Sequence, residues 1–587
     1  SATPTAFYRS VLAWNGAGWD LRLKDGTVYV FGDSAPLQAI RDRYGNTITI
    51  ARLVGGIGPV ARATSPHGRW FEFSYEGPLI SEIKDNIGRT WRYTYDGNSR
   101  LWKVTDPMDS VTEYTYDANH SMTSVKNRNG VVYVTNEYTT EADAPTPVGW
   151  VKKQTHADGG VYEFSYSAVD GKSTQTDVKD PRGYIRRVTF NGEGYTLVDT
   201  RALGQPTEQA AEAVRQAGAQ FVTSSTHSSG DQATVTYDAS GDLTSVTRLG
   251  GAPTTYTHHP TLQRLTSVTR PLNRTTAYGY DEAGNVTSIT DPLQHQTTFT
   301  FNDTGQRLSV TDALEHTTSY TYTGADLSTT TEPGGAVTTQ FTDSVGRVVA
   351  VTNPLGQTTR YTYDANDRKT SVTDAQGHQT TFEYFPEGQL KKVTNPDQHA
   401  TTYTYDSMGR LTSRTDPLMR TETLAYDHQG NLIESVDRNG QLTTRTYDAL
   451  GRLETITYAD SSSLTYTYDD RSRATHVVDS AGATIVRAYD DLDRVTSETT
   501  PQGTVTYTYD AAGRRETMTV PDQPVIIYTY DDADRLTTIS QGTSTVTFEY
   551  DDANRRTSLT LPNGLSTGYE YDERDQVISR QLSRSSV

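Results

Sequence analysis

A tyrosine-aspartate pair, or a variant of it, returns every 20 to 22 residues along most of this chain. From Tyr237 onward the register is kept to the end, except for one interval of 41 residues between Tyr322 and Tyr363. That interval holds a repeat with Thr342 in place of the tyrosine. A fixed short period indicates supersecondary units that stack on one another, not independent globular domains.

The repeat at Thr401–Thr421 shows what one unit folds into. Tyr403 and Tyr405 alternate with threonines, so the two rings share one face of a strand and the threonines share the other. The segment ends in a turn and a second strand of the same length. Each unit therefore predicts a β-hairpin.

The turn of this unit is read from its residue types. Asp406 is an acceptor that caps the turn, Gly409 takes a left-handed conformation and Arg410 starts the return strand. Asp416-Pro417 ends that strand, because proline has no N–H for the ladder. The residues to which we assign structural roles in the repeat are Tyr403, Tyr405, Asp406, Gly409, Arg410, Tyr447, Asp448, Gly451, Arg452, Tyr509, Asp510, Gly513 and Arg514.

Composition agrees with an all-β fold. Tyrosine occurs 38 times against 13 phenylalanines, and only 34% of the residues are hydrophobic. Tyrosine and the abundant threonine suit a pleated, half-buried surface. Disordered chains, by contrast, are poor in aromatic and β-branched residues. We expect a long antiparallel sheet of repeated hairpins with much exposed surface.

Charge and cysteine content exclude several classes of protein. The 53 basic and 72 acidic residues give a net charge of −19, which argues against binding nucleic acid or anionic membranes. There is no cysteine, so disulfides and thiolate metal sites are excluded. No apolar run is long enough for a transmembrane segment. The chain begins at Ser1 without a signal peptide, and we expect it to be part of a longer protein.

Three segments are expected within one array. Residues 1–68 form irregular hairpins or a cap, with a hairpin at Gly18–Phe31 that turns at Asp25-Gly26. Residues 69–236 are degenerate repeats with longer loops, such as the proline-containing Glu141–Val148. Residues 237–587 are regular repeats of 20 to 22 residues.

The segment Pro206–Phe221 has two interpretations. It is alanine-rich with charges at helical spacing, which is typical of a helix. The alternative is a degenerate repeat in which Val214-Arg215 stands where Tyr-Asp belongs. The spacing of 23 residues to Tyr237 favours the repeat.

The recurring Tyr-x-Tyr-Asp-x-x-Gly-Arg-Leu, as at Tyr403–Leu411, resembles the YD repeat of the RHS (rearrangement hotspot) proteins. The resemblance covers the chain from about Arg69 onward. It implies a long sheet that spirals into a hollow shell, which encloses a toxic domain in bacterial RHS proteins and toxin-complex subunits. In animal teneurins a similar barrel supports adhesion at the cell surface.

One feature of the bacterial members is missing. Their shells end in a DPxGL-type self-cleavage motif followed by a variable toxin, and neither is found here. Asp180-Pro181-Arg182-Gly183-Tyr184 is superficially similar to the motif. It lies within the array, where Asp-Pro turns also occur at Asp106, Asp291 and Asp416. We therefore interpret it as another turn.

Arithmetic predicts how far such a sheet winds. About 56 strands spaced ~4.8 Å apart give roughly 270 Å of sheet, or about one and a half turns at a diameter of about 60 Å. We expect an open ring or cup with two exposed sheet edges, which are covered by flanking segments or by another copy.

Candidate binding residues in the repeat each have a structural alternative. The acidic clusters Asp469-Asp470, Asp490–Asp493, Asp531–Asp534 and Asp551-Asp552 offer oxygen ligands for calcium, but they lie at the turn, and turn capping is favoured. Arg410, Arg452, Arg494, Arg514 and Arg535 follow the turns and are expected to pair with the aspartates rather than bind anions.

The tyrosine rows offer platforms for sugars, but a seam of rings stacked from hairpin to hairpin is favoured. Among twelve scattered histidines no zinc motif is found, and no nucleophile elbow or phosphate loop occurs. We expect no catalytic residue, no cofactor and no metal.

These observations, with the resemblance, predict a non-catalytic RHS-repeat shell, secreted or at the surface of a bacterium. Its expected partners are its own flanking regions or a toxin cargo that it encloses or displays. Two alternatives stay open: a surface scaffold for adhesion or glycan binding, and a filament subunit that self-associates through its open sheet edges.

Overall fold

A computed structural model describes residues 10–33, 36–54, 57–218 and 220–584. The described residues form a single antiparallel sheet of 54 strands, in which each strand pairs with the strands before and after it in the sequence. The sheet does not close on itself, so β1 (Val11–Trp14) and β54 (Val577–Arg584) are its two edges. The predicted all-β array of hairpins is confirmed.

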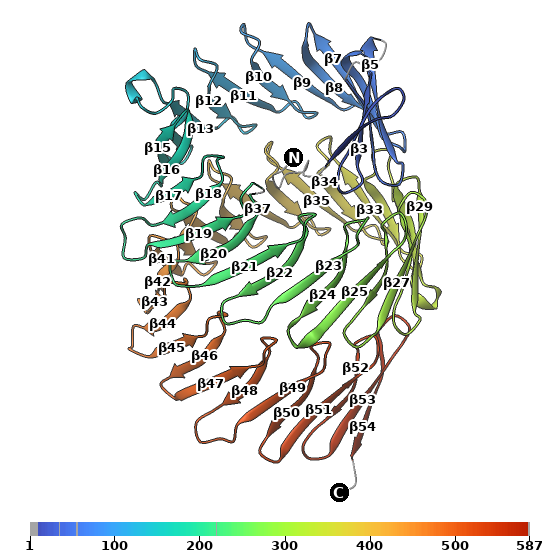
Figure 1. The fold of residues 1–587 in the computed structure, drawn as a ribbon, viewed down its shortest axis with the longest axis vertical. Coiled ribbons are helices and arrows are strands. Elements are labelled where there is room, and N and C mark those ends of the chain that lie inside the picture. Colours follow the sequence, from blue (N-terminus) through green and yellow to red (C-terminus); the bar gives the residue numbers. More distant parts are fainter. Residues whose placement is uncertain (1–9, 34–35, 55–56, 219, 585–587) are drawn as a thin grey trace.

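The sheet winds through two full coils and part of a third (Figure 1). The first coil comprises β1 (Val11–Trp14), β2 (Gly18–Arg22), β3 (Val28–Gly32), β4 (Leu37–Arg41), β5 (Thr47–Val54), β6 (Ile57–Thr64), β7 (Trp70–Glu76), β8 (Leu79–Asp85), β9 (Thr90–Tyr95), β10 (Leu101–Thr105), β11 (Val111–Tyr116), β12 (Met122–Lys126), β13 (Val132–Tyr138), β14 (Val151–His156), β15 (Val161–Val169), β16 (Lys172–Lys179), β17 (Ile185–Phe190), β18 (Thr196–Arg201), β19 (Gln209–Arg215), β20 (Val222–His227), β21 (Gln232–Tyr237) and β22 (Leu243–Arg248). The second comprises β23 (Thr254–His258), β24 (Leu265–Arg270), β25 (Arg274–Tyr280), β26 (Val286–Thr290), β27 (Gln296–Phe301), β28 (Arg307–Thr311), β29 (Thr317–Thr323), β30 (Asp326–Thr331), β31 (Val337–Thr342), β32 (Val348–Thr352), β33 (Thr358–Tyr363), β34 (Lys369–Thr373), β35 (Gln379–Tyr384), β36 (Leu390–Thr394), β37 (Ala400–Tyr405), β38 (Leu411–Thr415), β39 (Thr421–Tyr426), β40 (Leu432–Val436), β41 (Leu442–Tyr447), β42 (Leu453–Thr457), β43 (Ser463–Tyr468), β44 (Ala474–Asp479) and β45 (Thr484–Tyr489). The partial third coil comprises β46 (Val495–Thr500), β47 (Gly503–Tyr509), β48 (Arg515–Thr519), β49 (Ile526–Tyr530), β50 (Leu536–Gln541), β51 (Ser544–Tyr550), β52 (Arg556–Thr560), β53 (Leu565–Tyr571) and β54 (Val577–Arg584).

Helical structure is limited to three short 3₁₀ turns among the described residues. These are η1 (Glu141–Asp143), η2 (Pro271–Asn273) and η3 (Pro333–Gly335). None of the helices in the described ranges has the length and apolar character needed to cross a membrane.

Two kinds of turn alternate along the sheet. We call the turn that follows an anchor tyrosine, such as Asp406–Arg410, a YD turn, and the turn that leads to the next hairpin, such as Asp416–Arg420, a return turn. Both begin with a residue whose N–H donates to the carbonyl four residues later, at 2.9 Å for Asp406 and 3.0 Å for Asp416. Because the strands are antiparallel, the YD turns line one rim of the sheet and the return turns line the other.

The fourth residue of each turn adopts the left-handed conformation that the sequence predicts for glycine. Gly409 has φ 80° and Gly430 has φ 91°. Where glycine is absent, an aspartate, asparagine or serine often takes this position, such as Asp534 at φ 69°. A small polar side chain can adopt this conformation at a lower cost than most residues.

The sheet is a single layer with almost no apolar core. Of the described residues, only Val28, Val125, Val134 and Ala202 are buried and apolar. The threonine face of β37 is exposed at Thr402 and Thr404, whereas the tyrosines between them are half-buried. Stability therefore depends on the hydrogen-bonded ladder and on contacts between neighbouring hairpins.

The winding is tighter than the sequence arithmetic suggested. Arg89, between β8 and β9, contacts Asp367, between β33 and β34, and Asp158, between β14 and β15, contacts Arg410, between β37 and β38. Lys24, between β2 and β3, contacts Asp242, between β21 and β22. One coil thus takes 19 to 25 strands, about 90–120 Å of sheet at ~4.8 Å per strand, where a 60 Å diameter needs about 190 Å. Nearly every YD hairpin has a register shift, as between Thr404 and Tyr405, and such bulges bend and twist a sheet.

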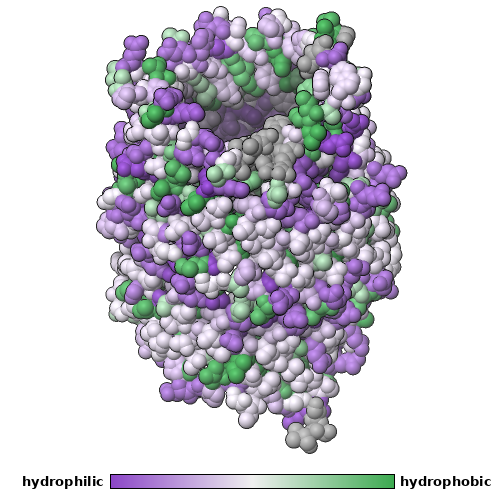
Figure 2. Space-filling view, viewed as in Figure 1, coloured by the Kyte–Doolittle hydropathy of each residue, from purple (hydrophilic) through white to green (hydrophobic). Residues whose placement is uncertain are grey.

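The expectation of one and a half turns is therefore wrong, because the coils stack into a hollow barrel of more than two turns. The expectation of an open sheet with two free edges is confirmed at β1 and β54. The space-filling view shows an opening at one end, and the part of the inner wall visible through it is largely hydrophilic (Figure 2).

Local predictions can be compared with the strands. The hairpin at Gly18–Phe31 is confirmed as β2 and β3, with Arg22 opposite Val28. Pro206–Phe221 contains the strand β19 and no helix, so the degenerate-repeat interpretation is confirmed. Gln209–Arg215 pairs on both sides, and the ladder outweighs the helix propensity of alanine.

The left-handed turn position predicts a measurable difference between two glycines. We expect Gly430→Ala to lower the free energy of unfolding of its region by about 1 kcal/mol, because a Cβ at positive φ is strained although nothing lies within 4 Å of it. Gly97→Ala is the control, since Gly97 has ordinary φ and equal space. Thermal unfolding monitored by circular dichroism compares them, and equal midpoints for both variants would contradict the assignment.

Candidate functional site

The functional unit that the sequence points to is the YD turn, and Asp406 organises the best example. Its Oδ1 accepts the backbone N–H groups of Met408 and Arg410, both at 2.9 Å. Its Oδ2 accepts the Nε–H of Arg410 at 2.6 Å. Both oxygens of this carboxylate are thus used within the turn.

Arg410 links this turn to the next hairpin. Its guanidinium donates to the carbonyl of Asp427 at 2.8 Å and lies over the ring of Tyr426, 5.1 Å from the centroid. A planar guanidinium can pair with a carboxylate through several N–H groups and lay its plane on a ring at the same time, whereas the ammonium of lysine is a point charge without a plane. One side chain therefore joins two successive repeats.

The anchor tyrosine makes the link in the opposite direction. The hydroxyl of Tyr405 donates to the carbonyl of Leu390, in the preceding hairpin, at 3.0 Å. Tyr403 lies two residues earlier on the same face, opposite Arg414 in the ladder. On the other face, the hydroxyl of Thr404 bonds those of Thr412 at 2.9 Å and Ser413 at 2.7 Å.

The same arrangement recurs at the other repeat residues singled out from the sequence. Asp448 caps its turn and pairs with Arg452, which lies 4.5 Å from the centroid of Tyr468. Asp510 pairs with Arg514, which lies 4.7 Å from the centroid of Tyr530. The hydroxyls of Tyr447 and Tyr509 donate to Leu432 and Val495 at 2.9 and 2.7 Å. Gly451 and Gly513 have φ 79° and 84°.

The seam along the tyrosines differs from the predicted one. In the described part of the chain no two anchor tyrosines stack directly, and in the repeats that carry the arginine its guanidinium lies between successive rings. At two places without the arginine an aromatic residue contacts the ring: Trp150 contacts Tyr166 at 4.8 Å and Phe221 stacks on Tyr237 at 4.7 Å. The expectation of a continuous row of stacked rings is thus corrected to rings alternating with guanidinium groups.

Burial and hydrogen bonding shift the pKa values of the groups in this unit. Burial alone raises the pKa of Asp510, but the hydrogen bonds from the backbone and side chain of Arg514 outweigh it, so the net pKa is below the ordinary value. Burial, with the neighbouring Tyr403, raises the pKa of Tyr405. Both groups thus keep their pairing forms, carboxylate and neutral phenol, around neutral pH.

A second set of contacts joins the coils. Return turns of one coil contact YD turns of the next, between 19 and 25 strands later in the chain. Lys24 and Asp242 lie 2.6 Å apart, Arg248 and Asp493 2.8 Å. Further pairs between coils are Tyr44 with Asn285, Arg69 with Asp326, Arg89 with Asp367, Asp106 with Asn366, Asp158 with Arg410, Arg182 with Asp448, Gln209 with Asp470 and Arg274 with Asp534.

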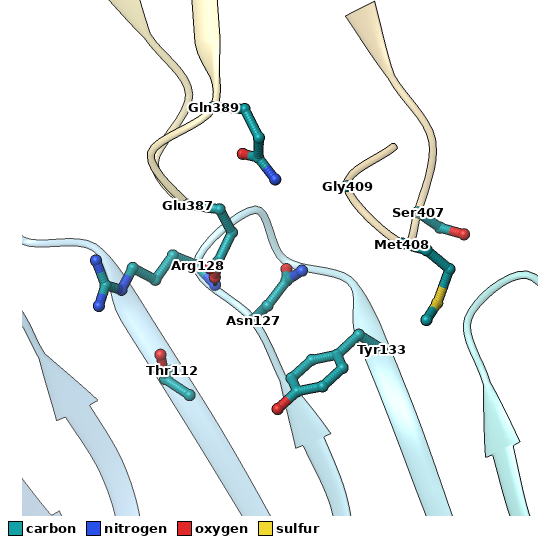
Figure 3. A pocket seen from close by; sticks show the side chains of 9 residues that line it. All are labelled: Thr112, Asn127, Arg128, Tyr133, Glu387, Gln389, Ser407, Met408 and Gly409. Atoms are coloured by element: carbon teal, nitrogen blue, oxygen red, sulfur yellow. Dashed lines mark hydrogen bonds between the residues drawn. The ribbon is translucent and has the colours of Figure 1, made fainter. Parts of the chain in front are cut away.

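Several small cavities lie along this contact between coils. Figure 3 shows one of about 270 Å³, lined by Arg128 and Tyr133 from the first coil and by Glu387, Gln389 and Met408 from the second. The backbone N–H of Arg128 donates to Glu387 at 2.5 Å across the gap. Gln389 Oε1 is buried without a hydrogen-bond partner, so the space suits a water molecule.

Comparison with known proteins identifies the repeat. The family model described as "RHS Repeat" matches residues 259–296, 343–380, 386–418, 426–463, 489–525, 530–565 and 550–585. This chain is an RHS-repeat protein. No curated protein sequence matches it.

Solved structures match the RHS-repeat protein over nearly its whole length. A TcdB2–TccC3 structure without the hypervariable C-terminal region covers 99% of this chain, with a TM-score of 0.53 and 13% sequence identity. A second TcdB2–TccC3 structure covers 98%, with a TM-score of 0.52 and 14% identity. At this identity the likeness concerns the fold. The chain spans 36% and 38% of those two structures, little more than a third of their length.

The segment with a superficial likeness to a self-cleavage motif is a return turn of the RHS-repeat protein. Asp180 Oδ1 accepts the backbone N–H groups of Arg182 and Tyr184, both at 2.9 Å. Arg182 donates to the carbonyl of Asp448 in the next coil at 2.8 Å. Asp180 therefore has the same capping geometry as Asp406.

The first aspartate of each acidic cluster has a different role from the aspartates that follow it. Asp469, Asp490, Asp531 and Asp551, the first member of each, cap their turns and pair with the arginine four residues later. Later members point outward or to other coils: Asp493 contacts Arg248, and Asp552 contacts His295. The four YD carboxylates are already occupied as in Asp406.

One group of possible metal ligands arises where coils meet. A ligand atom from each of Asp312, His316 and Asp575 lies within 4.8 Å of the others. No sequence pattern indicates this group, because Asp575 is 263 residues from Asp312 and no local motif contains both. The coil length, which sequence cannot supply, decides which turns meet.

The double role of the repeat arginine predicts that lysine cannot replace it. We expect Arg514→Lys to lower the unfolding free energy of its region by about 2 kcal/mol, since the pairing with Asp510 and the bond to Asp531 at 2.8 Å are lost together. Arg574→Lys is the control, because Arg574 is more exposed and makes a single pair with Asp572. Urea unfolding followed by circular dichroism measures both, and an unchanged Arg514→Lys midpoint would contradict the role.

The lowered pKa values predict acid sensitivity. Asp343, Asp469, Asp490 and Asp510 have pKa values below the ordinary 3.8 in the folded state. Their contribution to stability is complete above pH 3.8 and is lost as the pH falls through the folded pKa values. We expect the melting temperature to be level near neutral pH and to fall steeply below about pH 4.

A substitution separates this effect from general acid unfolding. Asp510→Asn should lower the melting temperature at pH 7 and make it less dependent on pH below 4, whereas Asp470→Asn, at an exposed carboxylate outside the cap, should leave the profile as in the parent protein. Identical pH profiles for Asp510→Asn and the parent protein would overturn the explanation.

Proposed function

We propose that this RHS-repeat shell is the non-catalytic wall of a container, which encloses or displays a polypeptide cargo such as a toxic C-terminal domain. The observation that carries the proposal is the stacking of coils around a hollow: return turns of one coil contact YD turns of the next, so the sheet makes a continuous wall. A wall of this kind keeps proteases and chaperones from what lies inside.

The inner surface is better suited to storing a polypeptide than to binding it tightly. The visible part of the inner wall is largely hydrophilic (Figure 2), and the chain carries a net charge of −19. Such a wall offers little apolar surface to an unfolded chain. The cargo is therefore held by enclosure. Its release needs the container to open, but it does not need a large binding interface to dissociate.

The rim of the sheet that has no coil opposite it indicates which partners the shell would bind. Return turns beyond Pro333 face no further coil in the described part of the chain, and there Leu355 and Leu418 are 82% and 71% exposed. Further YD-repeat segments, in the protein's flanking regions or in a second copy, would cover these turns. We propose that the protein works outside the cytoplasm, as a secreted or surface-exposed bacterial shell.

Of the two alternatives, the glycan-binding scaffold has the weaker physical support. A sugar needs a free ring face, and the repeat arginines cover faces of the anchor tyrosines, as Arg410 covers Tyr426 at 5.1 Å. Self-association through β1 and β54 stays a prediction, since both edges of the sheet are open.

Protease protection tests the container. An unfolded, protease-sensitive reporter segment is fused after Val587, and cleavage by proteinase K is followed on gels. We expect the fused segment to survive a protease concentration that degrades the same segment added in trans. The paired variant Asp158→Ala with Arg410→Ala, which opens one contact between coils, should shorten its lifetime. Equal cleavage rates for fused and free segments would overturn enclosure.

A further inference from the structure

A small cavity at the last contact between coils combines one imidazole with an excess of carboxylates. Its volume is about 310 Å³, and it lies between the return turn after β28 and the YD turn after β53. The acidic residues that line it are Asp312, Glu332, Glu573 and Asp575, against one arginine, Arg574. The cavity therefore carries uncompensated negative charge.

The cationic side chains nearby are already engaged. Arg574 pairs with Asp572 at 3.2 Å, and Arg555 pairs with Asp551 and with Asp575, both at 2.7 Å. Among the described residues, neither Glu332 nor Glu573 has a side-chain hydrogen bond or ion pair. Like charges gathered in a part-buried space repel one another unless a cation joins them.

His316 is oriented as metal-binding histidines are. Its Nδ1 lies 3.2 Å from Asp312 Oδ2, while Asp312 Oδ1 accepts two backbone N–H groups and is fixed by them. A carboxylate that holds one ring nitrogen leaves the lone pair of the other nitrogen, Nε2, available to a metal ion. Nε2 of His316 makes no hydrogen bond to a described residue.

Two other turns with the same Asp-x-x-x-His pattern show what is particular to this one. In the neighbouring repeat, His295 contacts Asp291 at 3.2 Å through Nδ1 and Asp552 of the next coil at 3.3 Å through Nε2, so no space remains. His378 contacts Asp374 at 3.0 Å but lies on the uncovered rim, 64% exposed, without a coil opposite. Only at His316, of these three, do a histidine, a cavity and carboxylates of another coil meet.

We propose that His316 Nε2, with Asp312 as the carboxylate that orients the ring, and Asp575 bind a Zn²⁺ ion that joins the last hairpin to the coil above it. One nitrogen or oxygen atom from each of Asp312, His316 and Asp575 lies within 4.8 Å of the others, and the ligand atoms of a tetrahedral Zn²⁺ site with bonds of about 2.0–2.1 Å lie about 3.4 Å apart. Asp575 is 61% exposed at a turn tip, so its side chain can rotate the remaining distance. Glu573 or Glu332 supplies a further oxygen.

The donor set decides between metals. One imidazole nitrogen with carboxylate oxygens suits Zn²⁺, whereas Ca²⁺ takes six to eight oxygens and no nitrogen. Asp575 has two oxygens, so Oδ1 keeps its pair with Arg555 while Oδ2 binds the ion. The ion would fasten β53 and β54 to the turn between β28 and β29, where the sheet otherwise ends in a free edge strand.

Zn²⁺ titration of the metal-stripped protein tests this site. We expect isothermal titration calorimetry to show one saturable site, weakened at least about tenfold by His316→Ala and by Asp575→Asn. His378→Ala is the matched control and should bind Zn²⁺ as the parent protein does. Absence of saturable binding, equal binding by His316→Ala, or an equal loss in His378→Ala would overturn the proposal.

Hydrogen exchange distinguishes a bridging ion from one bound at the surface, because an ion at the surface would not change the rates of amide exchange in β53 and β54. Zn²⁺ should slow amide exchange in β53 and β54 of the parent protein and leave it unchanged in His316→Ala, whereas Ca²⁺ should have no effect. Circular dichroism of each variant in EDTA checks that it is folded. Unchanged exchange in β53 and β54 on Zn²⁺ binding, or slowing by Ca²⁺ that persists in His316→Ala, would contradict a bridge between coils. The test does not depend on whether the shell holds a cargo.

Discussion

The link between successive hairpins is the interaction on which the rest of the structure depends. In a sheet one layer thick, with only four buried apolar residues among those that the structure describes, no hydrophobic core can hold the hairpins in order. Where the YD turn carries the repeat arginine, its aspartate fixes that arginine, which reaches the next tyrosine ring and the next turn carbonyl, as Arg410 reaches Tyr426 and Asp427. Each tyrosine hydroxyl in turn bonds the preceding hairpin. Every neighbour is thus held from both sides.

This link explains the unusual composition. Tyrosine outnumbers phenylalanine because the hydroxyl is used, and the repeat position carries arginine, whose plane both pairs and stacks. The exceptions at Trp150 and Phe221, which replace the arginine by another flat group, keep the stacking and lose the pairing. A stack of identical neighbours is stabilised as a one-dimensional array.

The contacts between coils turn that one-dimensional array into a wall. They join residues 216 to 278 positions apart, through pairs that share no common sequence pattern: Lys24 with Asp242, Arg89 with Asp367, Arg248 with Asp493. Individually such part-exposed pairs contribute little. Their number and regular spacing along the rim oppose the separation of coils, which is what a container requires. The cavities, and the proposed zinc site, lie along the same line.

The sequence by itself determined the hairpin, its turn chemistry and the antiparallel order of the array, because these depend on residues within one period. Asp406, Gly409 and Arg410 could be assigned their turn positions from spacing alone. For Pro206–Phe221 it favoured the degenerate repeat over the helix, because the spacing to the next repeat outweighed the alanine content. Only the tertiary structure decided that arginines separate the tyrosine rings and that one coil takes 19 to 25 strands. Curvature is a sum of small twists and bulges over many strands, and no local pattern records it. For that reason the meeting of Asp312 and His316 with Asp575 could not be read from the chain.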